Sequence, residues 1–184
     1  MLMRIASSIC FALLLAPAPA RPVDAPLRTP LGSISPCDED PGFAKLDFWL
    51  GDWNVFVGNE LAGTNRIVKV LAGCAIEEHW TGAGGSRGQS LFYYLPATQQ
   101  WKQVWVTENA LRPGGIKEKS LVAEFEDGGL RFQGLITLPS GGSYLDRTTL
   151  TPLPDGSVRQ QIGVSEDDGA TWRSTFDAVY RRKG

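Results

Sequence analysis

Histidine is almost absent from this chain of 184 residues, which contains only His79. Any Ser-His-Asp catalysis would have to use His79, and the Gly-x-Ser-x-Gly elbow is also missing. Cysteine is scarce too, with three residues, and no cysteines and histidines stand at the spacing of a zinc site. We therefore expect no metal centre.

Neither sign of charge forms a long block. The chain has 18 lysines and arginines against 20 aspartates and glutamates, for a formal net charge of −2. This balance argues against nucleic acid and against an anionic membrane surface as partners. The apolar run at residues 5–15 is too short to cross a bilayer. We expect no integral membrane span.

The first 20 residues have the three parts of a secretory signal peptide. Arg4 precedes the apolar run, and Ala18-Pro19-Ala20 is a small-x-small cleavage site. We predict cleavage near Ala20 and a periplasmic or secreted protein. A lipoprotein signal is the alternative, but Cys10 lies inside the apolar run rather than after it. Residues 21–36 are rich in proline and predict an extended tether, and residues 37–184 predict one domain.

Cleavage would leave two cysteines, Cys37 and Cys74. An even pair in an oxidising compartment predicts a disulfide, and two buried free thiols are the alternative.

Helical periodicity is confined to residues 38–50, where acidic residues and Pro41 mark a helix start. We expect a short helix that caps one end of the domain.

After Gly51 the apolar residues alternate with period two, between regular turn signals. About ten strands are predicted, beginning near residue 51 and then at 66–71, 74–81, 89–95, 101–107, 120–126, 130–138, 144–150, 158–165 and 171–181. A meander that long closes to remove its edges, so we predict an all-β, closed up-and-down antiparallel barrel, with a β-sandwich as the alternative.

The same alternation predicts which side chains face the lumen. The expected ligand-binding residues are Trp80, Gln103, Trp105, Phe132, Gln160, Phe176 and Tyr180. Others expected inside are Trp101, Thr107, Leu121, Ala123, Phe125, Gly134, Ile136, Val158, Ile162 and Trp172, with Thr175 outside.

Two strands are ambiguous, and for these we expect Glu78 and Arg147 to point inward. A carboxylate and a guanidinium inside one barrel are costly apart and tolerable together, so they predict an internal pair. The alternative is that one or both face solvent.

A resemblance appears at the two ends of the barrel. Gly51-Asp52-Trp53 on the first strand, with Arg181-Arg182 after the last, resembles the calycin arrangement, in which a tryptophan at the barrel base is covered by a basic side chain. We expect Gly51, Trp53 and Arg181 to have this structural role.

The chain also resembles bacterial proteins of the DUF1579-like family over nearly the whole mature domain. The resembling stretches are 48–53, 73–74 with 78–82, 100–106 and 156–160. This resemblance implies the barrel fold and no settled activity. In a related barrel family, nitrobindin, a histidine binds haem, so His79 is considered as a haem ligand or a general base. His79 sits in no motif that resembles that site, and strand parity favours a solvent-facing histidine, so we expect no cofactor.

Residues 165–172 fit Ser-x-Asp-x-Gly-x-Thr-Trp, which resembles the Asp-box of sialidase propellers. Propellers carry several copies, whereas this chain has one, so the motif predicts a structural turn.

Together these observations predict an exported barrel, monomeric or a small homo-oligomer, that binds a small apolar or aromatic ligand in its lumen. Two alternatives stay open. One is a small-molecule enzyme, such as an isomerase, lyase or hydrolase, that uses Glu78 and Arg147. The other is a filled barrel that serves as an interaction module.

Overall fold

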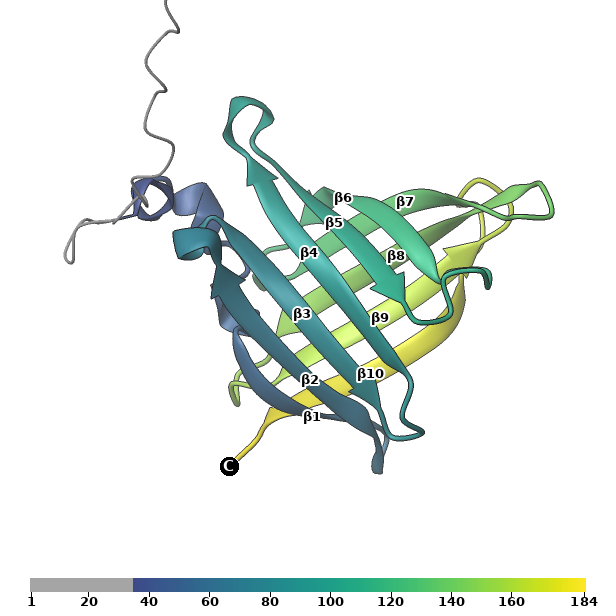
Figure 1. Ribbon diagram of the computed structural model, residues 1–184, viewed down its shortest axis with the longest axis horizontal. Helices are drawn as coiled ribbons and strands as arrows, with labels where there is room; N and C mark the ends of the chain where they lie inside the picture. Colours follow the sequence, from purple (N-terminus) through teal and green to yellow (C-terminus); the bar gives the residue numbers. More distant parts are fainter. Residues whose placement is uncertain (1–34) are drawn as a thin grey trace, which may run out of the picture. The chain divides into compact units, whose positions relative to one another are not determined.

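The computed structural model describes residues 35–184, so the predicted signal peptide and nearly all of the predicted tether lie outside the described residues. Ten antiparallel strands form one closed barrel (Figure 1). They are β1 (Gly51–Val57), β2 (Glu60–Val70), β3 (Ala75–Gly82), β4 (Arg87–Leu95), β5 (Gln100–Thr107), β6 (Ile116–Glu124), β7 (Leu130–Thr137), β8 (Ser143–Pro152), β9 (Val158–Ser165) and β10 (Arg173–Arg182). Each strand pairs with its neighbours in the chain, and β1 pairs with β10. The closed up-and-down barrel is confirmed, and the β-sandwich alternative is wrong.

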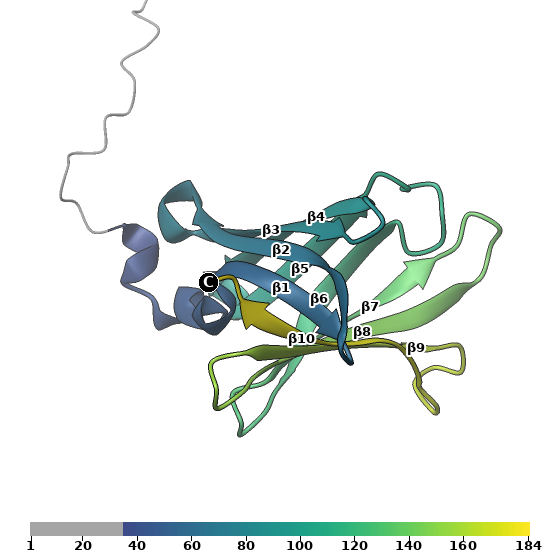
Figure 2. The same cartoon turned by 90° about the horizontal axis from the view of Figure 1, so that it is seen from below.

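The expected N-terminal helix does not form. Residues 36–49 instead make three 3₁₀ turns, η1 (Pro36–Asp38), η2 (Pro41–Ala44) and η3 (Asp47–Trp49), which gather at one end of the barrel (Figure 2). Phe43, Leu46 and Trp49 are buried and follow one another every third residue, which is the period of a 3₁₀ helix rather than of an α-helix. The apolar spacing that suggested a helix therefore serves these tighter turns.

These turns are tied to the barrel by hydrogen bonds and by a covalent bond. The indole Nε1 of Trp101 donates to the carbonyl of Gly42 at 2.9 Å, and Nε1 of Trp53 donates to the carbonyl of Trp49 at 2.9 Å. The predicted disulfide between Cys37 and Cys74 is confirmed. It joins η1 to the residue that follows a further turn, η4 (Leu71–Gly73). The remaining 3₁₀ turn, η5 (Pro96–Thr98), lies between β4 and β5.

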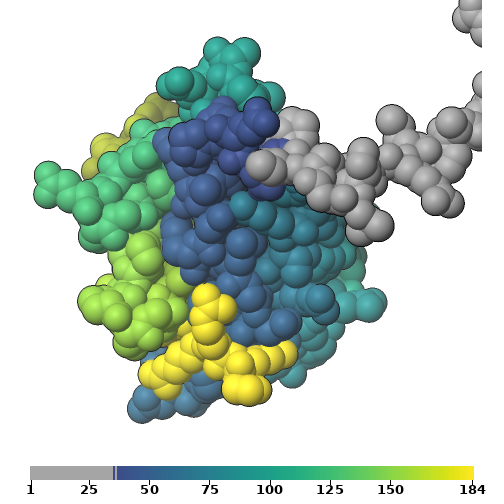
Figure 3. Space-filling model, turned by 90° about the vertical axis from the view of Figure 1, so that its left-hand side faces the viewer, coloured from purple at the N-terminus to yellow at the C-terminus, as the bar shows by residue number. Residues whose placement is uncertain are grey.

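Aromatic rings fill this end of the lumen. The buried set includes Trp49, Trp53, Trp101, Phe92, Phe132 and Tyr180. Trp49 packs edge-to-face against Phe92, with ring centroids 5.5 Å apart, and Phe92 packs in the same way against Phe132 at 5.4 Å. Figure 3 looks onto the outside of this end, where the blue residues that begin the described part of the chain run down the molecule and the yellow C-terminal residues lie beside them.

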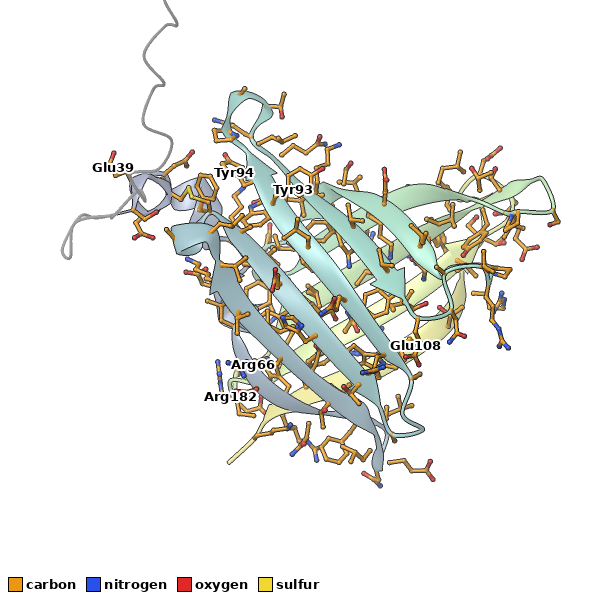
Figure 4. All side chains as sticks on the ribbon, viewed as in Figure 1. Glu39, Arg66, Tyr93, Tyr94, Glu108 and Arg182 are labelled. Atoms are coloured by element: carbon orange, nitrogen blue, oxygen red, sulfur yellow. A yellow bond between two sulfur atoms is a disulfide. The ribbon has the colours of Figure 1, made fainter. Side chains whose placement is uncertain are left out.

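The basic residue over Trp53 is Arg182 rather than the expected Arg181. The guanidinium carbon of Arg182 lies 4.4 Å from the Trp53 ring centroid, and Arg181 lies over Phe56 at 5.1 Å (Arg182 is labelled in Figure 4). The register explains this, because Arg182 is directly opposite Trp53 and opposed residues share a face of the sheet.

Gly51 makes room for this stacked arginine. Its φ is +135°, in the region that side chains disfavour, and a Cβ there would lie 2.5 Å from Nη1 of Arg182. The same nitrogen donates to the carbonyl of Leu50 at 3.1 Å. Gly51 thus has a structural reason to be a glycine.

Candidate functional site

A cavity of about 280 Å³ lies inside the barrel. Its wall is formed by Glu78, Trp80, Gln103, Trp105, Lys117, Lys119, Thr148, Gln160, Ile162, Thr175, Phe176 and Tyr180. Six of the seven expected ligand-binding residues are in this set, and Phe132 is the exception because it packs against Phe92 in the aromatic core. Glu78 is the one candidate catalytic residue on the wall.

The cavity has a buried end and a more exposed end. Glu78, Gln103, Gln160 and Tyr180 are buried, and Tyr180 contacts the aromatic core through Trp53 and Trp49. Trp80, Trp105, Lys117 and Phe176 are half-buried, and Thr175 is exposed. A small molecule would therefore enter past the tryptophans and Thr175 and meet the polar groups of the buried end.

Glu78 is hydrogen-bonded through both oxygens. Oε1 accepts from Nδ2 of Asn65 at 2.7 Å, and Oε2 accepts from Oγ of Ser90 at 2.6 Å. Burial raises the pKa of Glu78, although these two hydrogen bonds and the charge of Lys119 act in the opposite direction. A buried carboxyl of this kind takes up a proton more readily than an exposed one.

The network extends to Tyr180. Asn65 also donates from Nδ2 to the hydroxyl of Tyr180 at 3.2 Å, and that hydroxyl donates to Oε1 of Gln160 at 2.8 Å. Burial, together with the charge of Glu78, raises the pKa of Tyr180 well above its ordinary value. Tyr180 therefore stays protonated and keeps its role as a donor.

Gln103 has one oxygen without a partner. Its Nε2 donates to Oγ of Ser90 at 3.1 Å, and Ser90 uses its own proton on Glu78, which fixes the orientation of the Gln103 amide. Oε1 of Gln103 is buried and has no hydrogen-bond partner within the described part of the chain. Buried polar atoms are nearly always paired, so a free acceptor on a cavity wall indicates where a ligand donor would fit.

Two lysines of β6 form a cationic wall. Lys117 and Lys119 are two positions apart, so both face the lumen. Nζ of Lys117 lies 2.6 Å from Oδ2 of Asp146, while Nζ of Lys119 pairs with Oδ1 of Asp146 and donates to Oγ1 of Thr148 at 2.6 Å. Burial lowers the pKa of Lys119 to about 8, with Lys117 acting in the same direction and Asp146 opposing it.

Gly134 lies between these lysines and their partner. It is opposite Asp146 in the register of β7 and β8. A Cβ on Gly134 would lie 1.9 Å from the carbonyl oxygen of Glu118, and without a side chain there the lysines reach across β7. Asp146 itself is fully buried and is not part of the cavity wall, so the ammonium groups stand between the carboxylate and the cavity.

Arg147 does not face the lumen, and the expected pair with Glu78 does not exist. Its guanidinium carbon lies 3.8 Å from the ring centroid of Trp172, on the outside of the barrel. Thr148 is opposite Ile162 in the register, and because Ile162 lines the cavity, Thr148 must do so too and Arg147 must point outward. The expected face of β8 was wrong by one residue.

Four other orientations differ from expectation. Ala123 faces outward, because a bulge after Leu121 places it opposite the outward-facing Arg131. Trp172 belongs to the turn before β10 and donates from Nε1 to the carbonyl of Gly169 at 3.0 Å. Phe125 follows the end of β6 and is 38% exposed, with Arg131 over its ring. Thr175 lines the cavity because a bulge between Ser174 and Phe176 shifts the register of β10.

His79 lies on the outer face of β3, opposite to Glu78 and Trp80. Its Nδ1 is 2.9 Å from Nε2 of Gln89, and its Nε2 is 3.2 Å from Oε2 of Glu77. It does not line the lumen cavity. Its two partners, Gln89 and Glu77, are not on the cavity wall either, so His79 is not placed to act on a molecule in the cavity.

The Asp-box motif forms a self-contained turn. The carboxylate of Asp167 accepts from Oγ1 of Thr171 at 2.6 Å and from the backbone nitrogen of Thr171 at 2.9 Å, and Ser165 donates to it at 2.7 Å. The bonds from Thr171 and Ser165 lower the pKa of Asp167 to about 2. The side chains at the four polar motif positions, Ser165, Asp167, Thr171 and Trp172, all bond within the turn, which supports a structural role.

The sequence analysis missed more than half of the polar site: Asn65, Ser90, Lys117, Lys119, Asp146 and Thr148. The predicted strand began at residue 120, whereas β6 begins at Ile116, so the two lysines were never assigned to a face. Extending the alternation back from Leu121 would have placed both in the lumen. Phe92 and Ile67 would in the same way have placed Ser90 and Asn65 inside.

Comparisons with known proteins add no family to this geometry. No protein-family model and no curated protein sequence matches the chain.

Proposed function

We propose that this protein is an exported barrel that binds one small, largely apolar or aromatic molecule in its lumen. The observation that carries the proposal is the cavity of about 280 Å³, whose wall combines Trp80, Trp105 and Phe176 with the unpartnered Oε1 of Gln103. Ligand pockets commonly hold about 300 to 1,000 Å³, so the ligand is small. An apolar wall with a few placed polar groups is typical of such sites.

Export and family are part of the same proposal. The disulfide between Cys37 and Cys74 fits an oxidising compartment such as the periplasm or the cell exterior. Among residues 35–184 there is no helix long and apolar enough to cross a membrane. The stacking of Arg182 on Trp53 supports a calycin-like barrel, and membership of the DUF1579-like family stays a prediction, as does a monomeric or small homo-oligomeric state.

Indole and its N-methyl derivative test the binding function. Both are flat and apolar, but only indole has an N–H to donate to Gln103. Isothermal titration should show saturable binding of one indole per chain and weaker binding of the N-methyl derivative, by about tenfold if the hydrogen bond to Gln103 forms.

A cavity-filling variant, Ile162→Trp, should abolish binding, and Leu135→Trp on the outer face should not change it. Absence of binding by every aromatic probe, in a protein that also carries no ligand when isolated from its source, would contradict the proposal.

A small-molecule enzyme is the second candidate, and Glu78 is the observation that favours it. Its buried carboxyl with a raised pKa lines the same cavity as the cationic Lys119, which is an arrangement suited to acid or base catalysis in an isomerase, lyase or hydrolase. Arg147 has no part in it. Loss of a metabolite from an extract of the source organism, in the presence of the wild-type protein but not of Glu78→Gln, would favour the enzyme.

The third alternative, a filled barrel, is disfavoured by the cavity itself.

A further inference from the structure

The cationic wall of the cavity has more positive than negative charge. Lys117 and Lys119 share the single carboxylate of Asp146, one on each oxygen. One carboxylate balances one ammonium group, so the second has no ion-pair partner of its own among the described side chains. Burying an unbalanced charge is costly, and an anion beside the lysines would lower that cost.

No other protein group supplies this anion within the described residues. Asp146 lies behind the lysines and is not on the cavity wall. Glu78 on β3 is the other carboxyl of the cavity, but its two oxygens are held by Asn65 and Ser90, and it forms no ion pair with Lys117 or Lys119 among the described side chains. The remaining polar groups on the wall are neutral: Gln103, Thr148, Gln160, Thr175 and Tyr180.

The rest of the wall fits a flat apolar body. Trp80 and Phe176 pack edge-to-face, with ring centroids 6.3 Å apart. The ring of Trp105 packs directly on Gly88 of β4, so closely that a Cβ at this glycine would lie 2.4 Å from it. In the sheet register Trp105 is directly opposite Lys117, and opposed residues share a face. An aromatic surface and an ammonium group are therefore adjacent on the cavity wall.

From this juxtaposition we infer that the ligand is a small carboxylic acid, whose carboxylate lies against Lys117 and Lys119 and whose apolar body lies against Trp80, Trp105 and Phe176. The inference rests on the proposed binding function and specifies the chemical class of its ligand. A carboxylate offers two acceptor oxygens, one for each lysine, and its hydrogen bonds to ammonium groups are of the stronger, charge-assisted kind. Glu78 does not oppose the binding of an anion as strongly as an exposed carboxylate would, because burial favours its neutral form.

Cinnamate and cinnamamide test this inference directly, since they share one flat skeleton and differ in the charge of the head group. Isothermal titration of the wild-type protein at neutral pH and low salt should give cinnamate an affinity at least about tenfold higher than that of cinnamamide. Equal affinity for the two, or tighter binding of the amide, would overturn the inference while leaving the binding function intact. Binding of neither compound, nor of indole, would instead count against the proposed function itself.

Lysine variants locate the carboxylate. Lys117→Met removes one ammonium group and leaves Asp146 paired with Lys119, so no buried carboxylate loses its partner. The variant should weaken cinnamate binding about tenfold and leave cinnamamide unchanged. Lys102→Met on β5, whose ammonium group bonds Ser120 rather than the cavity, is the matched control and should bind both compounds as the wild type does. If Lys117→Met has the same ratio of cinnamate affinity to cinnamamide affinity as the wild type, the carboxylate does not lie beside Lys117. If this variant fails to fold, the same ratio measured on the wild type still decides the inference.

Discussion

Lys119 and Asp146 form an ion pair inside the barrel, and their side chains are only 2% and 1% exposed. Taking both groups out of water is costly. The pair is tolerable because Lys117 binds the second oxygen of Asp146 and Thr148 accepts a second hydrogen bond from Lys119. The pair positions the cationic wall of the cavity, so its disruption should affect both stability and binding.

Asp146→Asn should destabilise the protein by about 3 kcal/mol at neutral pH, because two lysines would lose their only carboxylate partner. Urea unfolding of the variant and the wild type measures the difference. Asp177→Asn is the matched control, since its partner Arg159 is about half exposed and surface pairs contribute about 1 kcal/mol or less. Equal losses in the two variants would show that Asp146 is not a buried ion-pair partner.

The titration of Lys119 predicts a distinctive pH dependence of stability. Burial lowers its pKa to about 8 from 10.5, so between these values the unfolded chain holds a proton that the folded protein has released. The contribution of Lys119 to the free energy of unfolding therefore rises as the pH increases from about 8 to 10.5, by up to about 3 kcal/mol. The free energy of unfolding of the wild type minus that of Lys119→Met should increase from neutral pH to the upper end of the window. A flat or falling difference would contradict the burial of this ammonium group, and Lys102→Met on the outer face provides the control series.

The disulfide should contribute about 3 to 4 kcal/mol through the 37-residue loop that it closes. Cys37→Ser and Cys74→Ser should each lower the free energy of unfolding by this amount, and the double variant should lose no more than either single variant. A thiol assay on the unfolded, unreduced protein should find no free cysteine apart from Cys10, if the predicted signal peptide is retained. Two further free thiols would show that the bond does not form.

The stacking on Trp53 distinguishes the two terminal arginines. Arg182→Ala should lower stability by about 1 to 2 kcal/mol, since it removes both the cation–π contact and the hydrogen bond to Leu50. Arg181→Ala should cost about 0.5 kcal/mol, because Arg181 stacks more distantly on Phe56 at the surface. Thermal unfolding of both variants makes the comparison, and a larger loss in Arg181→Ala would reverse the assignment.

Alternation predicted the barrel and most of the cavity wall, for a physical reason. In β5 and β9 the inward positions carry large apolar residues and amides, whereas the charged residues Lys102 and Arg159 face outward, so one face is plainly the core. Gln103, Trp105 and Gln160 were placed correctly on this basis. Trp80 was also placed correctly, but both faces of β3 carry a glutamate, so the sequence left that strand ambiguous.

The pattern failed where polar residues occupy both faces. In β8, Asp146 and Thr148 face inward while Arg147 and Thr149 face outward, and hydropathy does not separate these pairs. Only the register with β7 and β9 decides the face, and register is not readable from one strand. Lys117 and Lys119 were missed because the predicted strand began at residue 120, after both lysines. Their charge also argued against an inward position, since charged residues are buried only with a partner, and this partner lies on another strand.

Native mass spectrometry of the protein isolated from its own source tests the central claim most directly. The claim is that the lumen cavity of about 280 Å³ binds one small molecule. We predict a single bound compound per chain, released as a carboxylic acid on denaturation and absent from the Ile162→Trp variant. Protein that carries no bound compound, and that binds none of indole, cinnamate and cinnamamide in titrations, would contradict the account.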